Sequence, residues 1–198
     1  MGPGGAGGRG LGAGGPPTVT GPSEWPRGDR PLRVSVVGGA GATDEELRLA
    51  RELGAALARA DAVVVCGGYG GVMEGVARGA REEGGLTVGI LKGVEAGDAN
   101  PWITLPIPTG LGDARNALVV RAGESMVAVG GSWGTLSEIA MALKAGLAVG
   151  TLGTPPAPGL GLPDLGTPEK AAEWALARAR ERRGEMPPGG SGLSRRPR

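Results

Sequence analysis

Two side chains in this sequence, Arg115 and Glu138, are of types that could do chemistry together. Glu138 ends the stretch GGSWGTLSE (residues 130–138), which follows an apolar run and leads into a helical pattern. Glycines before a helix let backbone N–H groups approach an anion closely, and the helix dipole favours negative charge there. Arg115 begins an earlier helical segment, where a guanidinium can bind a phosphate or carboxylate through two parallel hydrogen bonds.

Both residues also have an ordinary structural interpretation. Thr135 and Glu138 have the T-x-x-E spacing of a helix capping box, which contributes up to about 1 kcal/mol, and spacing alone favours this interpretation of Glu138. Arg115 could equally be solvated or paired with Asp113. Arg121, two turns further along, is expected at the surface.

The residue types that are missing exclude several mechanisms. The chain contains no histidine, which excludes Ser-His and Cys-His catalysis and every histidine-ligated metal. Cys66 is the only cysteine, so it forms no internal disulfide, fits a reducing cytosol and is expected to be a buried thiol. Any catalysis must therefore use carboxylates, arginines, hydroxyls and backbone amides, and we expect no metal site.

The charge balance and hydropathy limit the partners. A net charge of +1 gives no strong attraction to nucleic acid or to a membrane surface, so neither is expected as a partner. No apolar run approaches the ~18–20 residues of a membrane span, and the Gly-rich N-terminus lacks the apolar region of a secretory signal. We therefore expect a cytoplasmic protein.

Composition divides the chain into three parts. Residues 1–30 and 184–198 are rich in Gly and Pro with little to bury, and both are expected to be disordered tails. Residues 31–183 alternate short apolar runs with helical patterns and are expected to form a single nucleotide-binding domain.

Within this domain the pattern predicts an α/β fold. Helices are expected between the strands and after Thr167, and Thr43 and Glu46 predict a capping box on the first of them. Near-continuous apolar strands indicate a Rossmann-like doubly wound parallel sheet with helices on both faces. The predicted strands are residues 33–37, 62–66, 86–91, 125–129 and 147–152, with an extended piece at 102–107.

Three of these strands end in glycine pairs, at 38–39, 67–68 and 130–131. Ligands of doubly wound folds lie at the carboxyl ends of the strands, so the three pairs are expected to meet at one edge. Each pair alone could be a tight turn, but three together favour a nucleotide-sized anionic ligand. Neither G-x-x-x-x-G-K-[ST] nor G-x-G-x-x-G is present, which disfavours a Walker ATPase and a standard NAD-binding domain.

Two blocks of the sequence resemble the LONELY GUY-like family, Rossmann-like proteins long labelled "possible lysine decarboxylase". VCGGYGGVMEGVARGA (65–80) is similar to its G-G-x-x-G-x-M segment. DARNALVVRAGESMVAVGGSWGTLSE (113–138) is similar, without a gap, to a block with an Arg-Lys pair followed by P-G-G-x-G-T-x-x-E. The resemblance covers roughly residues 33–152, and the intervening segment 88–116 is more similar to the branch of molybdenum-cofactor carrier proteins.

The resemblance implies roles for individual residues. Arg115 and Glu138 match the family's catalytic arginine and glutamate, which act at an N-glycosidic bond. The loop after the fourth predicted strand matches the loop that binds the 5′-phosphate, and the first block supplies further contacts. With the first glycine pair, the predicted phosphate- and nucleotide-binding residues are Gly38, Gly39, Gly67, Gly68, Gly71, Met73, Gly131, Ser132, Gly134 and Thr135.

Two functions follow from this resemblance. The favoured one is a nucleotide-binding protein with phosphoribohydrolase activity, which cleaves a nucleoside 5′-monophosphate to base and ribose 5-phosphate while Glu138 stabilises an oxocarbenium-like transition state. The alternative is a non-catalytic carrier for molybdenum cofactor or another phosphorylated ligand. Gly130, Ser132 and Asn116 replace a Pro, a Gly and a Lys of the hydrolase motif, and these departures favour the carrier.

Neither function requires a cofactor, although molybdenum cofactor could be a carried ligand. Lysine decarboxylation is excluded, because no lysine lies in a glycine turn to form a Schiff base with pyridoxal phosphate and no histidine can stack on it. The resemblance also implies a homodimer or a higher homo-oligomer that binds a small phosphorylated molecule.

Overall fold

Six parallel strands form one sheet, and its order explains where a ligand can bind. A computed structural model describes Met1 and residues 30–185. The sheet order is β4-β3-β2-β1-β5-β6, so β1 pairs with both β2 and β5. The strands are β1 (Arg33–Gly38), β2 (Val63–Cys66), β3 (Thr87–Leu91), β4 (Leu105–Pro108), β5 (Ser125–Val129) and β6 (Val149–Leu152).

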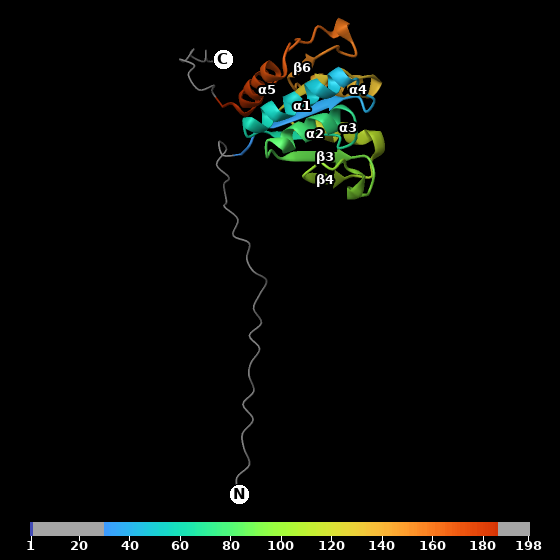
Figure 1. Ribbon diagram of the computed structural model, residues 1–198, viewed down its shortest axis with the longest axis vertical. Helices are drawn as coiled ribbons and strands as arrows, with labels where there is room; N and C mark the ends of the chain where they lie inside the picture. The colour runs from blue at the N-terminus through green and yellow to red at the C-terminus, as the bar shows by residue number, and fades with distance from the viewer. Residues whose placement is uncertain (2–29, 186–198) are drawn as a thin grey trace, which may run out of the picture. The chain divides into compact units, whose positions relative to one another are not determined.

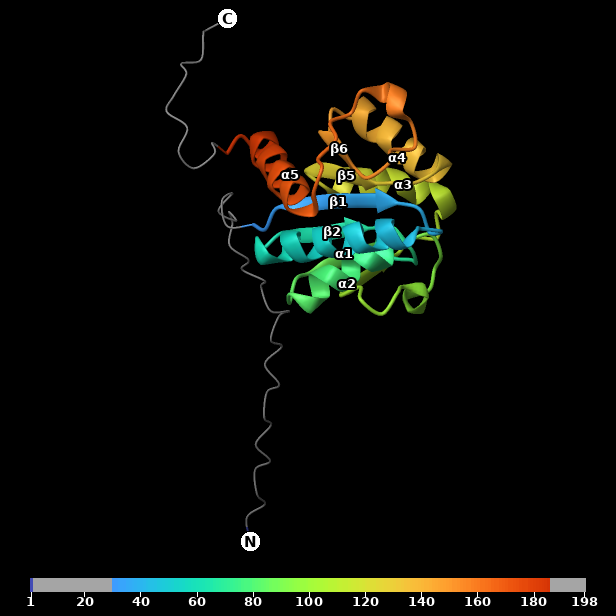
Figure 2. The same cartoon turned by 45° about the horizontal axis from the view of Figure 1, so that its top comes forward.

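Helices cover both faces of this sheet (Figures 1 and 2). On one face α1 (Asp44–Arg59), α2 (Val72–Glu82) and α5 (Pro168–Arg183) pack over Val64 and Cys66. On the other, α3 (Asn116–Ala122) and α4 (Trp133–Lys144) pack over strand residues that include Val63 and Val65. The alternation of β2 side chains between the two cores explains its continuous apolar sequence, and the predicted doubly wound α/β fold is confirmed.

Local signals fix most helix ends where the sequence predicts them. The backbone N–H of Glu46 donates to Thr43 Oγ1 at 3.2 Å and the N–H of Thr43 donates to Glu46 Oε2 at 2.8 Å, so the predicted capping box of α1 is confirmed. Thr167 caps α5. The segment after Asp113 differs from the prediction: a 3₁₀ turn, η2 (Gly112–Arg115), precedes α3. Two further 3₁₀ turns are η1 (Ala96–Asp98) and η3 (Pro158–Leu160).

At the amino end of the strands, one buried glutamate joins β1, β5 and α5. The Glu124 carboxylate accepts from the Arg33 backbone N–H at 2.9 Å, and from Arg183 Nε at 2.6 Å and Arg183 Nη2 at 2.7 Å. Burial by itself raises the pKa of Glu124, but the hydrogen bonds from Arg183 and Arg33 outweigh it and hold this pKa below its usual value.

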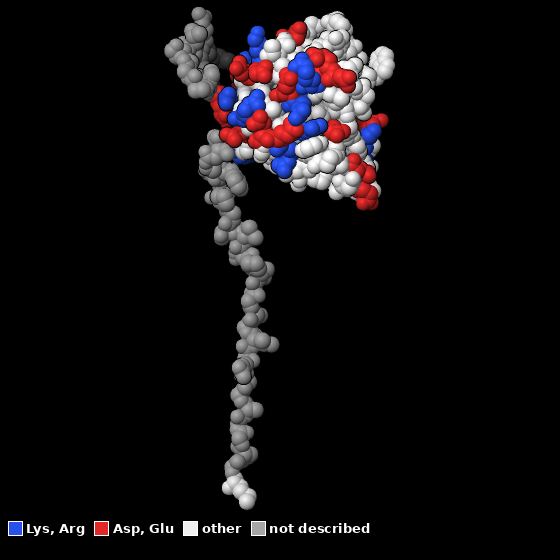
Figure 3. Space-filling view, viewed as in Figure 1, with Lys and Arg blue, Asp and Glu red and all other residues white. Residues whose placement is uncertain are grey.

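The outer face of α1 and α2 carries both signs of charge, closely mixed (Figure 3). Exposed ion pairs such as Arg51–Glu82 and Arg48–Glu52 account for much of this pattern. Among the described residues no helix is both long and apolar enough to cross a membrane. The predicted disordered tails, 1–30 and 184–198, lie almost entirely outside the described residues.

Candidate functional site

A pocket of about 160 Å³ opens at the carboxyl end of the sheet, where β1 lies between β2 and β5. The chain leaves β1 towards β2 and later returns to the other side of β1, and such a reversal creates the crevice in which doubly wound folds bind ligands. Most of the predicted site residues line this pocket: Gly38, Gly39, Gly67, Met73, Arg115, Ser132, Gly134, Thr135 and Glu138.

Three predicted binding glycines, Gly68, Gly71 and Gly131, are not among the lining residues, and each shapes the backbone instead. All three have positive φ angles, of 80°, 67° and 111°. A Cβ at Gly71 would collide with the carbonyl oxygens of Gly39 and Ala40, and one at Gly131 with the Thr135 side chain. These glycines therefore allow the strand-end loops to approach one another closely.

Arg115 ends η2 and is buried, with 5% of its surface exposed. Both structural interpretations of this residue are wrong: it is not solvated, and Asp113 lies instead 3.7 Å from Lys92 Nζ. Gly67 makes room for the guanidinium, because a Cβ there would lie 2.6 Å from both terminal nitrogens. Within residues 30–185, Arg115 makes no hydrogen bond, and its buried Nε is without a partner.

Glu138 lies in the second turn of α4 and is 7% exposed. The capping-box interpretation is wrong, because the N-cap of α4 is Ser132 and Thr135 is already inside the helix. Glu138 Oε1 faces Arg115 Nη1 at 3.8 Å, and no group in the described part of the chain donates a hydrogen bond to the carboxylate. Burial raises the pKa of Glu138 to about 7, although the Arg115 charge opposes the shift.

Two buried charged groups without hydrogen bonds are an unusual combination. Buried polar groups are nearly always hydrogen-bonded, because an unsatisfied one costs about 1–3 kcal/mol and a charged one more. The Arg115 and Glu138 groups face one pocket, so their hydrogen-bonding capacity is available to a ligand.

The start of α4 provides a second set of donors. Ser132 makes no side-chain cap, and the first hydrogen bond inside the helix is from the Leu136 N–H to the Ser132 carbonyl. The N–H groups before Leu136 can therefore bind an anion in the pocket. The start of α2 differs, because the Val72 N–H already donates to the Gly39 carbonyl at 3.1 Å.

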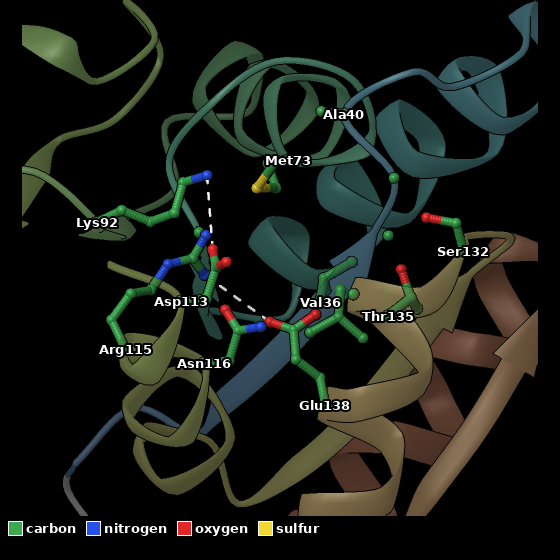
Figure 4. A pocket seen from close by; sticks show the side chains of 15 residues that line it. Val36, Ala40, Met73, Lys92, Asp113, Arg115, Asn116, Ser132, Thr135 and Glu138 are labelled. Atoms are coloured by element: carbon green, nitrogen blue, oxygen red, sulfur yellow. Dashed lines mark ion pairs between the residues drawn. The ribbon is translucent and has the colours of Figure 1, made fainter. Parts of the chain in front are cut away.

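Four residues near the pocket were not predicted as site residues from the sequence: Lys92, Asp113, Asn116 and Tyr69. The first three line the pocket (Figure 4). The Tyr69 hydroxyl accepts from the backbone N–H groups of Lys92 at 2.8 Å and of Gly93 at 3.3 Å. The only available signal for Lys92 was its position directly after a predicted strand, at the edge where ligands bind.

Other features of the described chain are poorer candidates for a site. A groove of about 620 Å³ between α1 and α2 is lined by exposed Arg and Glu side chains that already pair with one another. Burial raises the pKa of Cys66 to about 11, so its thiol is not a nucleophile at neutral pH. Residues 30–185 contain no group of three or more His, Cys, Asp or Glu that could hold a metal ion.

Comparisons with known proteins give one family model and several similar proteins. The model of the SLOG cluster4 family matches residues 31–174. An uncharacterized protein of Archaeoglobus fulgidus is 37% identical over 146 residues, which are 74% of this chain and 95% of that protein. The structure of the molybdenum cofactor binding protein of Rippkaea orientalis is 31% identical with a TM-score of 0.71, and the match covers 75% of this chain and 98% of that one. The molybdenum cofactor carrier protein of Chlamydomonas reinhardtii is 33% identical with a TM-score of 0.67, covering 75% and 99%.

Proposed function

This chain belongs to the SLOG cluster4 family, and we propose that it is a binding or carrier protein for a phosphorylated ligand held in the pocket between β1 and β5. The single observation that carries this proposal is the buried, hydrogen-bond-free pair of Arg115 and Glu138 facing the pocket. The names of the similar solved structures support molybdenum cofactor as one candidate for the carried ligand.

The ligand's phosphate would bind at the start of α4, where Ser132, Gly134 and Thr135 line the pocket and backbone N–H groups of the first turn can donate to it. Arg115 would donate to a ligand oxygen, which satisfies a buried cation. Glu138 changes its protonation state near pH 7, so it can either donate to the ligand or accept from it.

The size of the pocket indicates how much of the ligand is enclosed. Pockets for drug-sized ligands have volumes of roughly 300–1,000 Å³, and this one has about 160 Å³. The phosphate and a neighbouring group of a nucleotide or phosphorylated pterin fit inside, so the ring would lie at the mouth. The donor set and the volume are thus compatible with a phosphorylated ring ligand.

Mass spectrometry of small molecules released from the purified native protein tests the proposal. We expect a phosphorylated ring compound in the wild-type protein and its loss in Arg115→Met. Titration calorimetry with AMP, IMP and GMP provides an independent test, because at least one of them should bind. A protein that retains no phosphorylated compound and binds none of these nucleotides would contradict the proposal.

A second function, phosphoribohydrolase activity, is favoured by one observation: a buried carboxylate and a buried arginine face each other at 3.8 Å in the lining of one pocket. Glu138 would stabilise the positive charge that develops on the sugar as the base leaves. Incubation with nucleoside monophosphates, followed by chromatography for free base, distinguishes enzyme from carrier. If the wild type releases base and Glu138→Gln does not, the protein is an enzyme in which Glu138 takes part in catalysis.

The homodimer and the cytoplasmic location predicted from the sequence belong to this proposal as well. Light scattering during size-exclusion chromatography measures the first of these directly.

A further inference from the structure

The pocket has two chemically different ends (Figure 4). One end, formed by Ser132 and Thr135 at the start of α4, offers N–H and hydroxyl groups. The opposite end contains Lys92, Asp113 and Arg115, and Glu138 lies between the two ends. An ammonium and a guanidinium can only donate hydrogen bonds, so the second end is rich in charged donors.

Lys92 is held at this end by Tyr69. The Tyr69 hydroxyl accepts the backbone N–H of Lys92 at 2.8 Å, which fixes the residue's main chain. The Tyr69 ring lies 5.6 Å from Lys92 Nζ and 6.0 Å from Arg115 Cζ, within the range of a cation–π contact. One side chain from the loop after β2 thus orients both cations of the pocket.

The counter-ion of Lys92 is easily exchanged. Lys92 Nζ lies 3.7 Å from Asp113 Oδ1, and the two side chains are 48% and 91% exposed. Exposed ion pairs of this kind contribute little to stability, with a median of about 0–1 kcal/mol. A ligand oxygen that reaches the mouth can therefore replace Asp113 at small cost.

The two ends of the pocket come from strands that are not neighbours in the sheet. Lys92 follows β3 and the α4 loop follows β5, and these strands are separated by β2 and β1. Three inter-strand spacings of roughly 4.8 Å place the strand ends about 14 Å apart. With a phosphate at the start of α4, we expect the far end of an elongated ligand, its ring, to be the group nearest Lys92.

We propose that Lys92, positioned by Tyr69, selects ligands whose ring carries an oxygen acceptor, such as a 6-oxopurine or an oxopterin, over rings with an amino group there. This inference rests on the proposed function and deepens it by naming the ligand class. An ammonium donates to a ring carbonyl oxygen, whereas an exocyclic amino group is itself a donor and repels it. Lys92 thereby acts as a specificity-determining residue.

IMP and AMP provide the test, because position 6 of the purine carries an oxygen acceptor in IMP and an amino donor in AMP, while the neighbouring N1 carries a hydrogen in IMP and is an acceptor in AMP. Titration calorimetry of the wild type is expected to give about tenfold tighter binding of IMP, as one charged hydrogen bond supplies. In Lys92→Met the IMP affinity should fall to the level of the AMP affinity. The AMP affinity should stay unchanged. Lys144→Met, at an exposed lysine that ends α4, is the matched control and should keep the preference.

Two further variants separate recognition from a structural role. Lys92→Arg keeps a cationic donor and should retain the preference for IMP. Asp113→Asn removes the counter-ion of Lys92 and should tighten IMP binding at low salt about two- to fivefold more than AMP binding, because only the IMP ring accepts from Lys92 at position 6.

Equal binding of IMP and AMP by the wild type would overturn the inference. So would equal losses of both affinities in Lys92→Met, because Lys92 would then contact the phosphate. Failure of the wild type to bind either nucleotide, with no phosphorylated compound co-purifying, would count against the proposed function itself, and the inference would fall with it.

Discussion

The two ends of the sheet each bury a glutamate beside an arginine, but the two pairs are built differently. At the amino end, Glu124 is 10% exposed and accepts hydrogen bonds from Arg33 and Arg183. At the carboxyl end, the side chain of Glu138 is 9% exposed and faces Arg115 at 3.8 Å without a hydrogen bond from any described residue. The two glutamate side chains are therefore buried to a similar extent, whereas the number of arginines and of hydrogen bonds around each of them differs.

This difference separates a stabilising pair from a binding pair. Hydrogen bonds keep the pKa of Glu124 low, whereas burial raises the pKa of Glu138 to about 7. A satisfied buried pair holds elements together, and an unsatisfied one costs stability unless a ligand completes it. The same residue types thus stabilise the fold at one end and are available for binding at the other.

The largest expected effect comes from breaking the amino-end pair. Glu124→Ala removes the carboxylate that accepts from the partly buried Arg183 and from the Arg33 backbone, and it should lower the free energy of unfolding by about 3 kcal/mol, measured by urea denaturation. Glu181→Ala, which removes the partner of the half-exposed Arg178, should cost no more than about 0.5 kcal/mol. Similar small costs for both variants would show that the Glu124 pair does not hold α5 to the sheet.

The two glutamates should give pH dependences of opposite sign. Because the folded-state pKa of Glu138 is raised to about 7 from 4.5, the folded state binds the extra proton between these values and stability falls as pH rises. The slope is about 1.4 kcal/mol per pH unit, or about 3 kcal/mol in total. Glu124, with its lowered pKa, instead contributes stability that is lost as pH falls below 4.5.

Urea denaturation of ligand-free wild type and Glu138→Gln from pH 5 to pH 7.5 measures the Glu138 effect. The difference in unfolding free energy between the two proteins should change by about 3 kcal/mol across this range. A difference that is independent of pH would mean that Glu138 is ionised throughout.

A smaller effect is expected from placing a methyl group against Arg115 of the Arg115–Glu138 pair. A Cβ at Gly67 would lie 2.6 Å from Arg115 Nη1, Arg115 Nη2 and Met73 Sδ, all at the ends of side chains that can move. Gly67→Ala should therefore displace Arg115 and weaken IMP binding about fivefold, a loss of about 1 kcal/mol. Gly97→Ala, with open space around it, is the control and should bind normally. Unchanged binding in Gly67→Ala would mean that the position of Arg115 does not matter.

Most of the fold could be predicted from the sequence, because its signals are local. Thr43 and Thr167 mark helix starts as predicted, and continuous valines mark buried parallel strands. The convergence of the glycine pairs also follows from the fold class, since all parallel strands end at the same edge.

The site was predicted less completely, because its contacts are between distant segments. Thr43–Glu46 and Thr135–Glu138 have the same spacing, yet the first is a capping box and the second is not. The difference arises because α4 begins after Ser132, which places Glu138 one turn deeper, opposite Arg115. Only the sheet order brings Tyr69 and Lys92 beside them, so no local pattern predicted either.

The central claim is that the carboxyl-end pair is kept for a ligand rather than for stability. The double variant Arg115→Met with Glu138→Gln removes both charges and retains side chains of similar volume. Calorimetric titration with IMP, alongside urea denaturation of the same samples, tests the claim most directly. We predict at least tenfold weaker binding, from the loss of about 1.5–3 kcal/mol of charged hydrogen bonds, with undiminished stability. Unchanged IMP binding together with a marked loss of stability would contradict it.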